Sequence, residues 1–155
     1  MPLNFFAPKP GRFGVMPTYV RSGQIGGANF LGGASPLTAN TTTIFRLGGL
    51  AGRTAMFSGF GATTVTVPAD ADGAITAAVY KFRASDNTAV KLSADIDLEA
   101  LVTREETTAK ALGISDADLT LVAGDALEIH VVSNSAAIDT QPAGLVFVAE
   151  MLVEN

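Results

Sequence analysis

Proline and glycine are concentrated in the first 36 residues of this chain, which restricts what that stretch can form. Five of the seven prolines and seven of the sixteen glycines lie there. Proline removes a backbone donor and glycine weakens regular structure, so we expect neither a helix nor a central strand. The stretch nevertheless carries large apolar side chains, which a merely solvated tail would lack. We therefore predict an extended N-terminal arm, residues 1–36, that becomes ordered on a protein surface.

The arm also differs from the rest of the chain in charge. It has three basic residues and no acidic one, a net charge of +3, whereas residues 37–155 carry seven basic and fifteen acidic residues, a net charge of −8. This contrast favours docking of the arm on a neighbouring subunit, although its aromatic residues could also fold back onto their own chain. The residues that we assign to surface binding are Phe5, Phe6, Lys9, Arg12, Phe13, Tyr19, Arg21 and Phe30.

Residues 37–155 have the pattern of a single all-β domain. Short β-branched or alternating runs are separated by turn signals at residues 85–87 and 124–125. The number and spacing of the runs favour a two-sheet β-sandwich, of jelly-roll or Greek-key type. The last run begins apolar on both faces, which predicts a central strand. Strands are expected at residues 41–47, 54–60, 63–67, 74–83, 88–101, 126–133 and 145–153, with a bulge or bend at Gly59 and Gly61.

Alternation also predicts which side chains face the core. In residues 74–83 we expect the odd-numbered positions on one face and the even-numbered ones on the other. In residues 88–101 we expect Leu92, Ala94, Ile96, Leu98 and Ala100 to face inward, and Ser93, Asp95, Asp97 and Glu99 to face water.

One segment carries a clear helix-start signal. Thr103 followed by Glu106 forms a capping box, and Gly113 is suited to end the helix. This predicts one short helix of about two turns between residues 103 and 113. Residues 115–118 are expected to form a turn or a single helical turn.

Composition excludes several classes of function. A net charge of −5 and a pI near 4.7 argue against nucleic-acid binding. The chain has no cysteine, which excludes disulfides and thiolate sites. Its start lacks the pattern of a signal peptide and it has no apolar run of about 20 residues, so we expect a protein made in the cytoplasm, with no membrane partner.

The candidates for chemistry are weak. The glycine-rich residues 23–33 lack the spacing of a phosphate loop and favour a surface segment. His130, the one histidine, is expected to be an exposed or interface strand residue rather than a catalytic base, and it cannot form a multi-histidine metal site. Residues 70–73 resemble the start of a calcium loop without the later ligands, so they favour a surface turn.

Asp95, Asp97 and Glu99 form a row of carboxylates on one strand face. A solvated face is the expected role; a polar subunit contact, a cation site or acid–base catalysis are the alternatives. Altogether we predict no enzymatic activity, no cofactor and no metal.

The likeness of this chain to a known family is carried by residues 52–60 (GRTAMFSGF), 68–73 (PADADG), 77–82 (AAVYKF), 92–101 (LSADIDLEAL), 103–106 (TREE), 124–129 (GDALEI) and 132–145 (VSNSAAIDTQPAGL). Together these stretches resemble small structural proteins of tailed bacteriophages, of the capsid decoration or cement type. The resemblance covers about two thirds of the chain and implies a β-rich body on the exterior of a double-stranded DNA phage head, often as a trimer, without chemistry of its own. No individual binding residue can be carried over.

The expected function is therefore that of a structural virion protein, a cement subunit that binds the outer surface of a phage head and stabilises it by bridging capsid subunits. The expected partners are the major capsid protein and other copies of this chain in a homotrimer. The alternative is a head-fibre, tail or host-surface module that binds glycans. The absence of tryptophan, with only Tyr19 and Tyr80 as tyrosines, disfavours that alternative.

Overall fold

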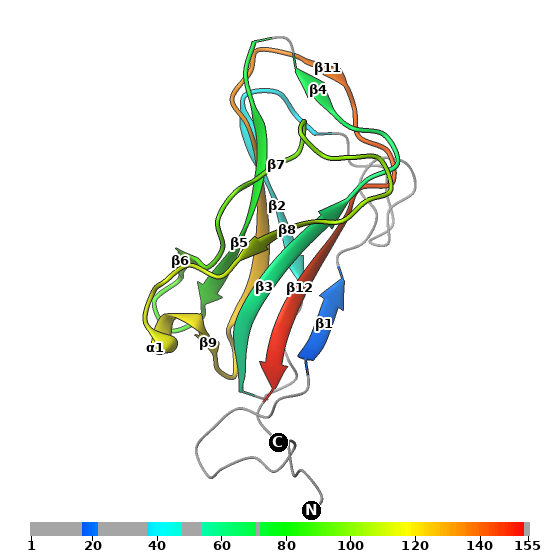
Figure 1. The fold of residues 1–155 in the computed structure, drawn as a ribbon. Coiled ribbons are helices and arrows are strands. Elements are labelled where there is room, and N and C mark those ends of the chain that lie inside the picture. The colour runs from blue at the N-terminus through cyan, green and yellow to red at the C-terminus, as the bar shows by residue number, and fades with distance from the viewer. Residues whose placement is uncertain (1–16, 22–36, 48–53, 71, 154–155) are drawn as a thin grey trace, which may run out of the picture.

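The structure, a computed structural model, describes residues 17–21, 37–47, 54–70 and 72–153. These residues form two five-stranded antiparallel sheets packed face to face, which confirms the predicted all-β, sandwich-like fold (Figure 1). The elements are β1 (Pro17–Arg21), β2 (Thr41–Leu47), β3 (Ala55–Thr63), β4 (Ala69–Asp70), β5 (Ile75–Arg83), β6 (Thr88–Lys91), β7 (Ile96–Asp97), β8 (Thr107–Lys110), α1 (Asp116–Leu119), β9 (Thr120–Leu121), β10 (Ala126–Ser133), β11 (Ile138–Thr140) and β12 (Val146–Val153).

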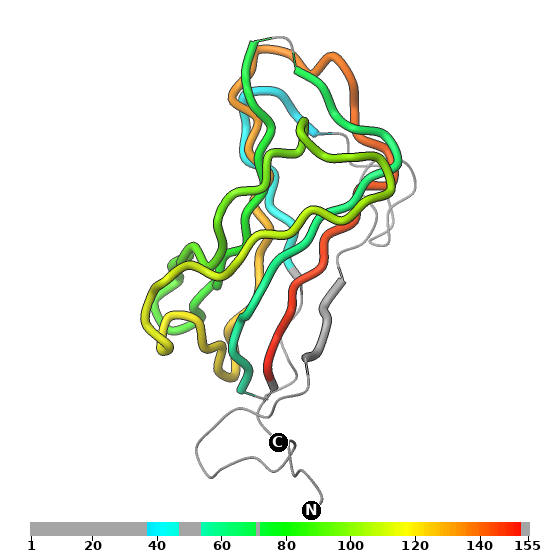
Figure 2. The backbone as a smooth tube through the Cα atoms, in the orientation of Figure 1, coloured from blue at the N-terminus to red at the C-terminus, as the bar shows by residue number. Residues whose placement is uncertain are grey.

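Each sheet combines strands from distant parts of the chain. The first sheet has the order β1-β12-β3-β8, with β9 also paired to β3. The second has the order β2-β10-β5-β6, with β7 also paired to β5. The small pair β4 and β11 lies at one end of the molecule (Figure 2). The last strand, β12, lies between β1 and β3, which confirms its predicted central position.

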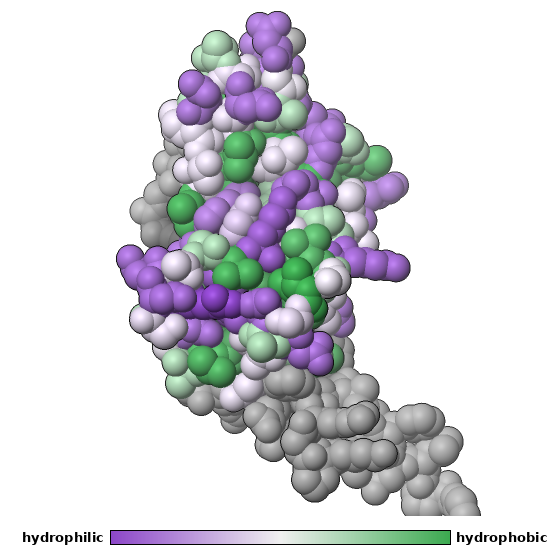
Figure 3. Space-filling view, turned by 90° about the vertical axis from the view of Figure 1, so that its left-hand side faces the viewer, coloured by the Kyte–Doolittle hydropathy of each residue, from purple (hydrophilic) through white to green (hydrophobic). Residues whose placement is uncertain are grey.

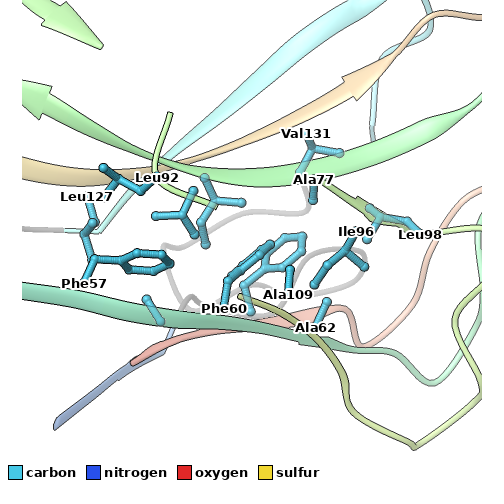
Figure 4. Close-up of a cluster of buried hydrophobic side chains, with 14 of the residues drawn as sticks. Phe57, Phe60, Ala62, Ala77, Leu92, Ile96, Leu98, Ala109, Leu127 and Val131 are labelled. Atoms are coloured by element: carbon cyan, nitrogen blue, oxygen red, sulfur yellow. The ribbon is translucent and has the colours of Figure 1, made fainter. Parts of the chain in front are cut away.

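The core lies between the two sheets and follows the alternation of the strands. Ile75, Ala77 and Val79 on β5 are at most 1% exposed. They share one core cluster with Phe57 and Phe60 of β3, and Figure 4 shows Ala77 on the strand across the core from these two rings. The predicted faces of residues 74–83 are therefore confirmed, because alternate residues of a strand point to opposite sides of its sheet.

A β-bulge in β3 lets two phenylalanines share the core. Gly59 lies opposite Glu150, but Phe57 lies opposite Met151, so Ser58 is the extra residue. Phe57 and Phe60 are three positions apart and would otherwise face opposite sides of the sheet. With the bulge both are buried, at 1% and 2% exposure. This confirms the irregularity predicted near Gly59.

The predicted helix between residues 103 and 113 is wrong. Residues 107–110 form β8, which pairs with β3 and buries Ala109. Arg104 has a φ of 65°, which a right-handed helix cannot contain. The capping box is a local signal for only about two turns of helix, and pairing with a formed sheet outweighs it. Within the described residues, the helix is α1, whose N-terminus is capped by the Ser115 side chain. It lies where a turn or a single helical turn was predicted, at residues 115–118.

The long extended run at residues 88–101 breaks into two short strands. Leu92, Ile96 and Leu98 are buried as predicted. Ala94 and Ala100, however, are exposed, and Ser93 is fully buried. Its hydroxyl accepts a hydrogen bond from the Val79 N–H at 2.9 Å and donates to the Ala94 carbonyl. β6 and β7 both pair with β5. Alternation fails between them because Ser93 lies between Val79 of β5 and Ala111, which follows β8.

The segment between β6 and β7 joins the two sheets along one side of the sandwich. Ser93 forms an isolated bridge with Ala111, just after β8. The Leu112 N–H donates to the Leu92 carbonyl at 2.7 Å. The strand predicted at residues 63–67 is also interrupted: β3 ends at Thr63, and Thr66 pairs separately with Ala143.

Part of the predicted arm belongs to the first sheet. β1 runs antiparallel to β12, from Pro17 opposite Leu152 to Arg21 opposite Val148. It lies at the edge of the sheet, where a proline at the first strand position is tolerated. The other residues of the arm lie outside the described ranges. Within those ranges no helix is long and apolar enough to span a membrane.

Candidate functional site

Most of the residues predicted to bind a surface lie outside the described ranges. Tyr19 and Arg21 are placed by their backbone in β1, opposite Glu150 and Val148. Their assignment to surface binding stays a prediction. The remaining six, all outside the described ranges, are Phe5, Phe6, Lys9, Arg12, Phe13 and Phe30.

A network of polar and aromatic side chains covers the outer face of the second sheet. Its centre is Glu128 on β10, whose side chain is only 5% exposed. Arg46 on the neighbouring strand β2 donates from Nε to Oε1 of Glu128 at 3.0 Å. The Nε2 atom of His130 lies 2.9 Å from Oε2. Each carboxylate oxygen of Glu128 therefore has a side-chain partner.

Aromatic rings pack against two members of this network. The Tyr80 ring stacks on His130, with centroids 3.9 Å apart and 14° between the planes. The Arg46 guanidinium lies 4.2 Å from the centroid of Phe82, a cation–π contact. His130 is thus a strand residue beside Glu128, as predicted, but its side chain is only 13% exposed. Its contacts with Glu128 and Tyr80 hold the imidazole in place.

The network is expected to make stability depend on acid pH. Burial raises the pKa of Glu128, but the hydrogen bonds from His130 and Arg46 outweigh it and hold the pKa below its ordinary value of 4.5. Such a group stabilises the fold above its unfolded pKa, and this contribution is lost as pH falls through the folded value. Urea unfolding of wild type and Glu128→Gln should therefore show a stability difference that shrinks on acidification below about pH 4.5. Glu105→Gln, at an exposed position, is the control. If the stability difference between wild type and Glu128→Gln does not shrink at acid pH, the stabilising role assigned to ionised Glu128 is contradicted.

The row of carboxylates does not form one site. Asp95 pairs with Lys91 at 2.7 Å, while Asp97 accepts a hydrogen bond from the Glu99 N–H at 3.0 Å. Glu99 is half-buried rather than solvated, since its two oxygens accept from the N–H groups of Asp70 and Ile75. Each carboxylate thus has a separate local role.

On the side of the molecule that carries β6 and α1, hydrophobic residues form small areas between hydrophilic ones (Figure 3).

The calcium-loop candidate is a turn in the described part of the chain. Oδ1 of Asp70 accepts a hydrogen bond from the Asp72 N–H at 3.0 Å, which is a local turn contact. Within the described ranges, no group of three or more acidic or histidine side chains is arranged to hold a metal ion.

The outer face of the first sheet carries a groove that the sequence analysis missed. It crosses β12, β3 and β8 and has a volume of about 240 Å³. Gly59 and Gly61, both on β3, form its floor, because neither has a side chain to fill the space. Glu106, Lys110 and Glu150 line its sides. The glycines predicted only a bend; their alignment beneath two carboxylates requires the pairing of three strands.

No protein-family model matches this chain, and no curated protein matches it in sequence. Among solved structures, its fold is similar to a chain in the structure of infectious bursal disease virus, Gx strain, with 14% identity and a TM-score of 0.39. The match covers 91% of this chain and 37% of the viral chain, so this chain spans little more than a third of that one. A likeness this weak carries no inference about function.

Proposed function

We propose that the protein is a structural virion protein, a decoration subunit that binds the outer surface of a phage head. The observation that carries the proposal is the division of the sequence into a cationic, proline- and glycine-rich arm and an anionic β-sandwich. The sequence resemblance to phage cement proteins points the same way. In this function the sandwich body sits on the shell as a homotrimer, and the arm lies across the junction between capsid subunits.

The proposed arm contact would contribute a substantial free energy to binding on the capsid. If it buries several hundred Å² of apolar surface, the gross gain at about 25 cal/mol per Å² is on the order of 10 kcal/mol. Ordering the arm removes a large part of this gain. The remainder is repeated in every copy on the shell, and multivalent attachment increases its effect.

Removal of residues 1–16 is expected to lower occupancy on the capsid. This deletion keeps β1, which belongs to the sheet, and removes Phe5, Phe6, Lys9, Arg12 and Phe13. The measurement is the copy number bound to particles of the encoding virus that have been stripped of this protein. We expect at least a tenfold rise in the dissociation constant, which corresponds to about 1.4 kcal/mol or more.

Two further measurements make this test decisive. Circular dichroism and thermal unfolding of the truncated protein check that the sandwich remains folded. Unchanged occupancy of a folded, truncated protein would remove residues 1–16 from the mechanism. Binding to a glycan array that survives the truncation would instead favour the glycan-binding alternative. Tyr80 offers little support for that alternative, since one face of its ring is stacked on His130.

A further inference from the structure

The groove on the first sheet presents two carboxylates above a floor without side chains. Oε2 of Glu150 lies 3.2 Å from the position that a Cβ atom of Gly59 would occupy. A Cβ atom at Gly61 would collide with Oε1 of Glu106. Each carboxylate therefore lies over one glycine. Because Gly59 and Gly61 are two residues apart on one strand, the carboxylates are about 7 Å apart along it.

This arrangement suits a cationic side chain. Within the described residues, neither Glu106 nor Glu150 forms a side-chain hydrogen bond or an ion pair. An ammonium or guanidinium group placed between them would contact both, and arginine can bond to a carboxylate through two N–H groups. Lys110 lies on the same groove, opposite Gly59, so the groove as a whole has one negative charge in excess.

The chain itself supplies a segment of complementary charge. Residues 1–16 contain Lys9 and Arg12 and no acidic residue. Gly11 and Gly14 beside these residues allow a close approach of the backbone to the sheet. The segment is joined to β1, which lies at the edge of the same sheet next to β12.

The direction of β1 favours a groove on another copy. Pro17, the first residue of β1, lies opposite Leu152, whereas the groove lies beside Val148 and Glu150, so β1 begins at the end of the sheet away from the groove. Two strand spacings and two to four residues along the strand separate Pro17 from the groove, about 15 Å in all. Five residues join Arg12 to Pro17, at most about 17 Å when extended, and eight join Lys9 to Pro17, at most about 27 Å. To reach the groove of its own copy the segment must reverse direction, which uses most of the length available to Arg12 and part of that available to Lys9, whereas a groove on another copy requires no such reversal.

We propose that residues 1–16 of one copy dock in the groove of a second copy, with Lys9 or Arg12 between Glu106 and Glu150. The aromatic residues of the segment stay available for the shell. This contact joins copies of the chain and does not depend on capsid binding. It can therefore be tested on the isolated full-length protein, and its result is separate from the occupancy experiment.

Zero-length carbodiimide cross-linking tests the contact directly. Equal amounts of heavy-isotope and ordinary full-length chains are mixed, refolded together and cross-linked, and the linked peptides are identified by mass spectrometry. We expect Lys9 to be linked to Glu106 or Glu150, with heavy–light pairs at the statistical fraction. An Arg12→Lys variant extends the same readout to the second cation. Linked peptides from within single chains only, or no link from either lysine, would overturn the proposal.

Matched variants separate the groove from general charge effects. The double variant Glu106→Gln and Glu150→Gln should abolish the heavy–light cross-links to the groove. It should also weaken self-association, measured by sedimentation, at least tenfold. Glu105→Gln removes one carboxylate next to Glu106 but outside the groove and should change neither result. Gly61→Ala keeps every charge and displaces the carboxylate of Glu106, so it should lower self-association. Equal effects of Glu105→Gln and the double variant would also overturn the proposal.

Discussion

Replacement of Phe147 by alanine should cost about 3–5 kcal/mol of unfolding free energy. Phe147 is fully buried on β12, the strand that links β1 and β3. Its ring packs on Phe60, with centroids 5.5 Å apart and 26° between the planes. The substitution leaves a cavity between the two sheets and removes this ring contact. Since domains of this size are stable by about 5–15 kcal/mol, the loss is a large fraction of the total.

Urea and thermal unfolding would measure this effect. The melting temperature is expected to fall by roughly 10–20 °C. Val148→Ala is the matched control, because Val148 is the next residue on β12, is half-buried and lines the groove instead of the core. It should cost less than about 1 kcal/mol. If Phe147→Ala prevents folding, Phe147→Leu provides the comparison, and a loss no larger than that of Val148→Ala would contradict the assigned core.

Replacement of Lys81 by methionine is expected to cost about 1–3 kcal/mol. Lys81 is a core-facing residue of β5 with only 3% exposure. Its Nζ atom donates hydrogen bonds to the carbonyls of Ala117 and Thr120, both at 2.9 Å. These carbonyls lie at the end of the short helix α1. Methionine keeps the apolar stem but removes the donor, so the packing of α1 against β5 should loosen.

Lys91→Met is a matched control on the neighbouring strand β6. Lys91 pairs with the exposed Asp95 at the surface, and such pairs contribute about 0–1 kcal/mol. Burial, together with repulsion from Arg83, lowers the pKa of Lys81 below its ordinary value of 10.5. Charged Lys81 therefore carries a folding penalty, which is relieved as pH rises toward 10.5. The stability advantage of wild type over Lys81→Met should grow over that range, and a constant advantage would contradict the burial of the charge.

Period-two patterns in the sequence predicted most of the fold because they report directly on which face of a strand is buried. The bounds of β2 and β10 agree with the predicted strands. Alternation grouped Lys81 with Ile75, Ala77 and Val79 on one face, which the structure shows to be the core side, although a lysine is rarely buried. What the pattern could not supply was its partner, since the carbonyls that accept its hydrogen bonds lie 36 and 39 residues away.

The errors occurred where a distant strand competes with a local signal. Residues 107–110 follow a capping box but pair with β3, some 50 residues earlier in the chain. Ser93 was assigned to water by alternation, but its position between β5 and Ala111 buries it. In both segments the tertiary structure provides backbone partners that no short window of sequence contains.

The sequence by itself determined the alternating faces, the turns and the charge contrast between the arm and the body, because each depends on the identity and local order of residues. Only the tertiary structure decided that β12 lies between β1 and β3, that Glu128 is enclosed by Arg46 and His130, and that two carboxylates lie over Gly59 and Gly61. The physical reason is that these features depend on strand register. Register is fixed by how the two sheets bury their apolar faces together, over distances in the chain that local propensity does not reach.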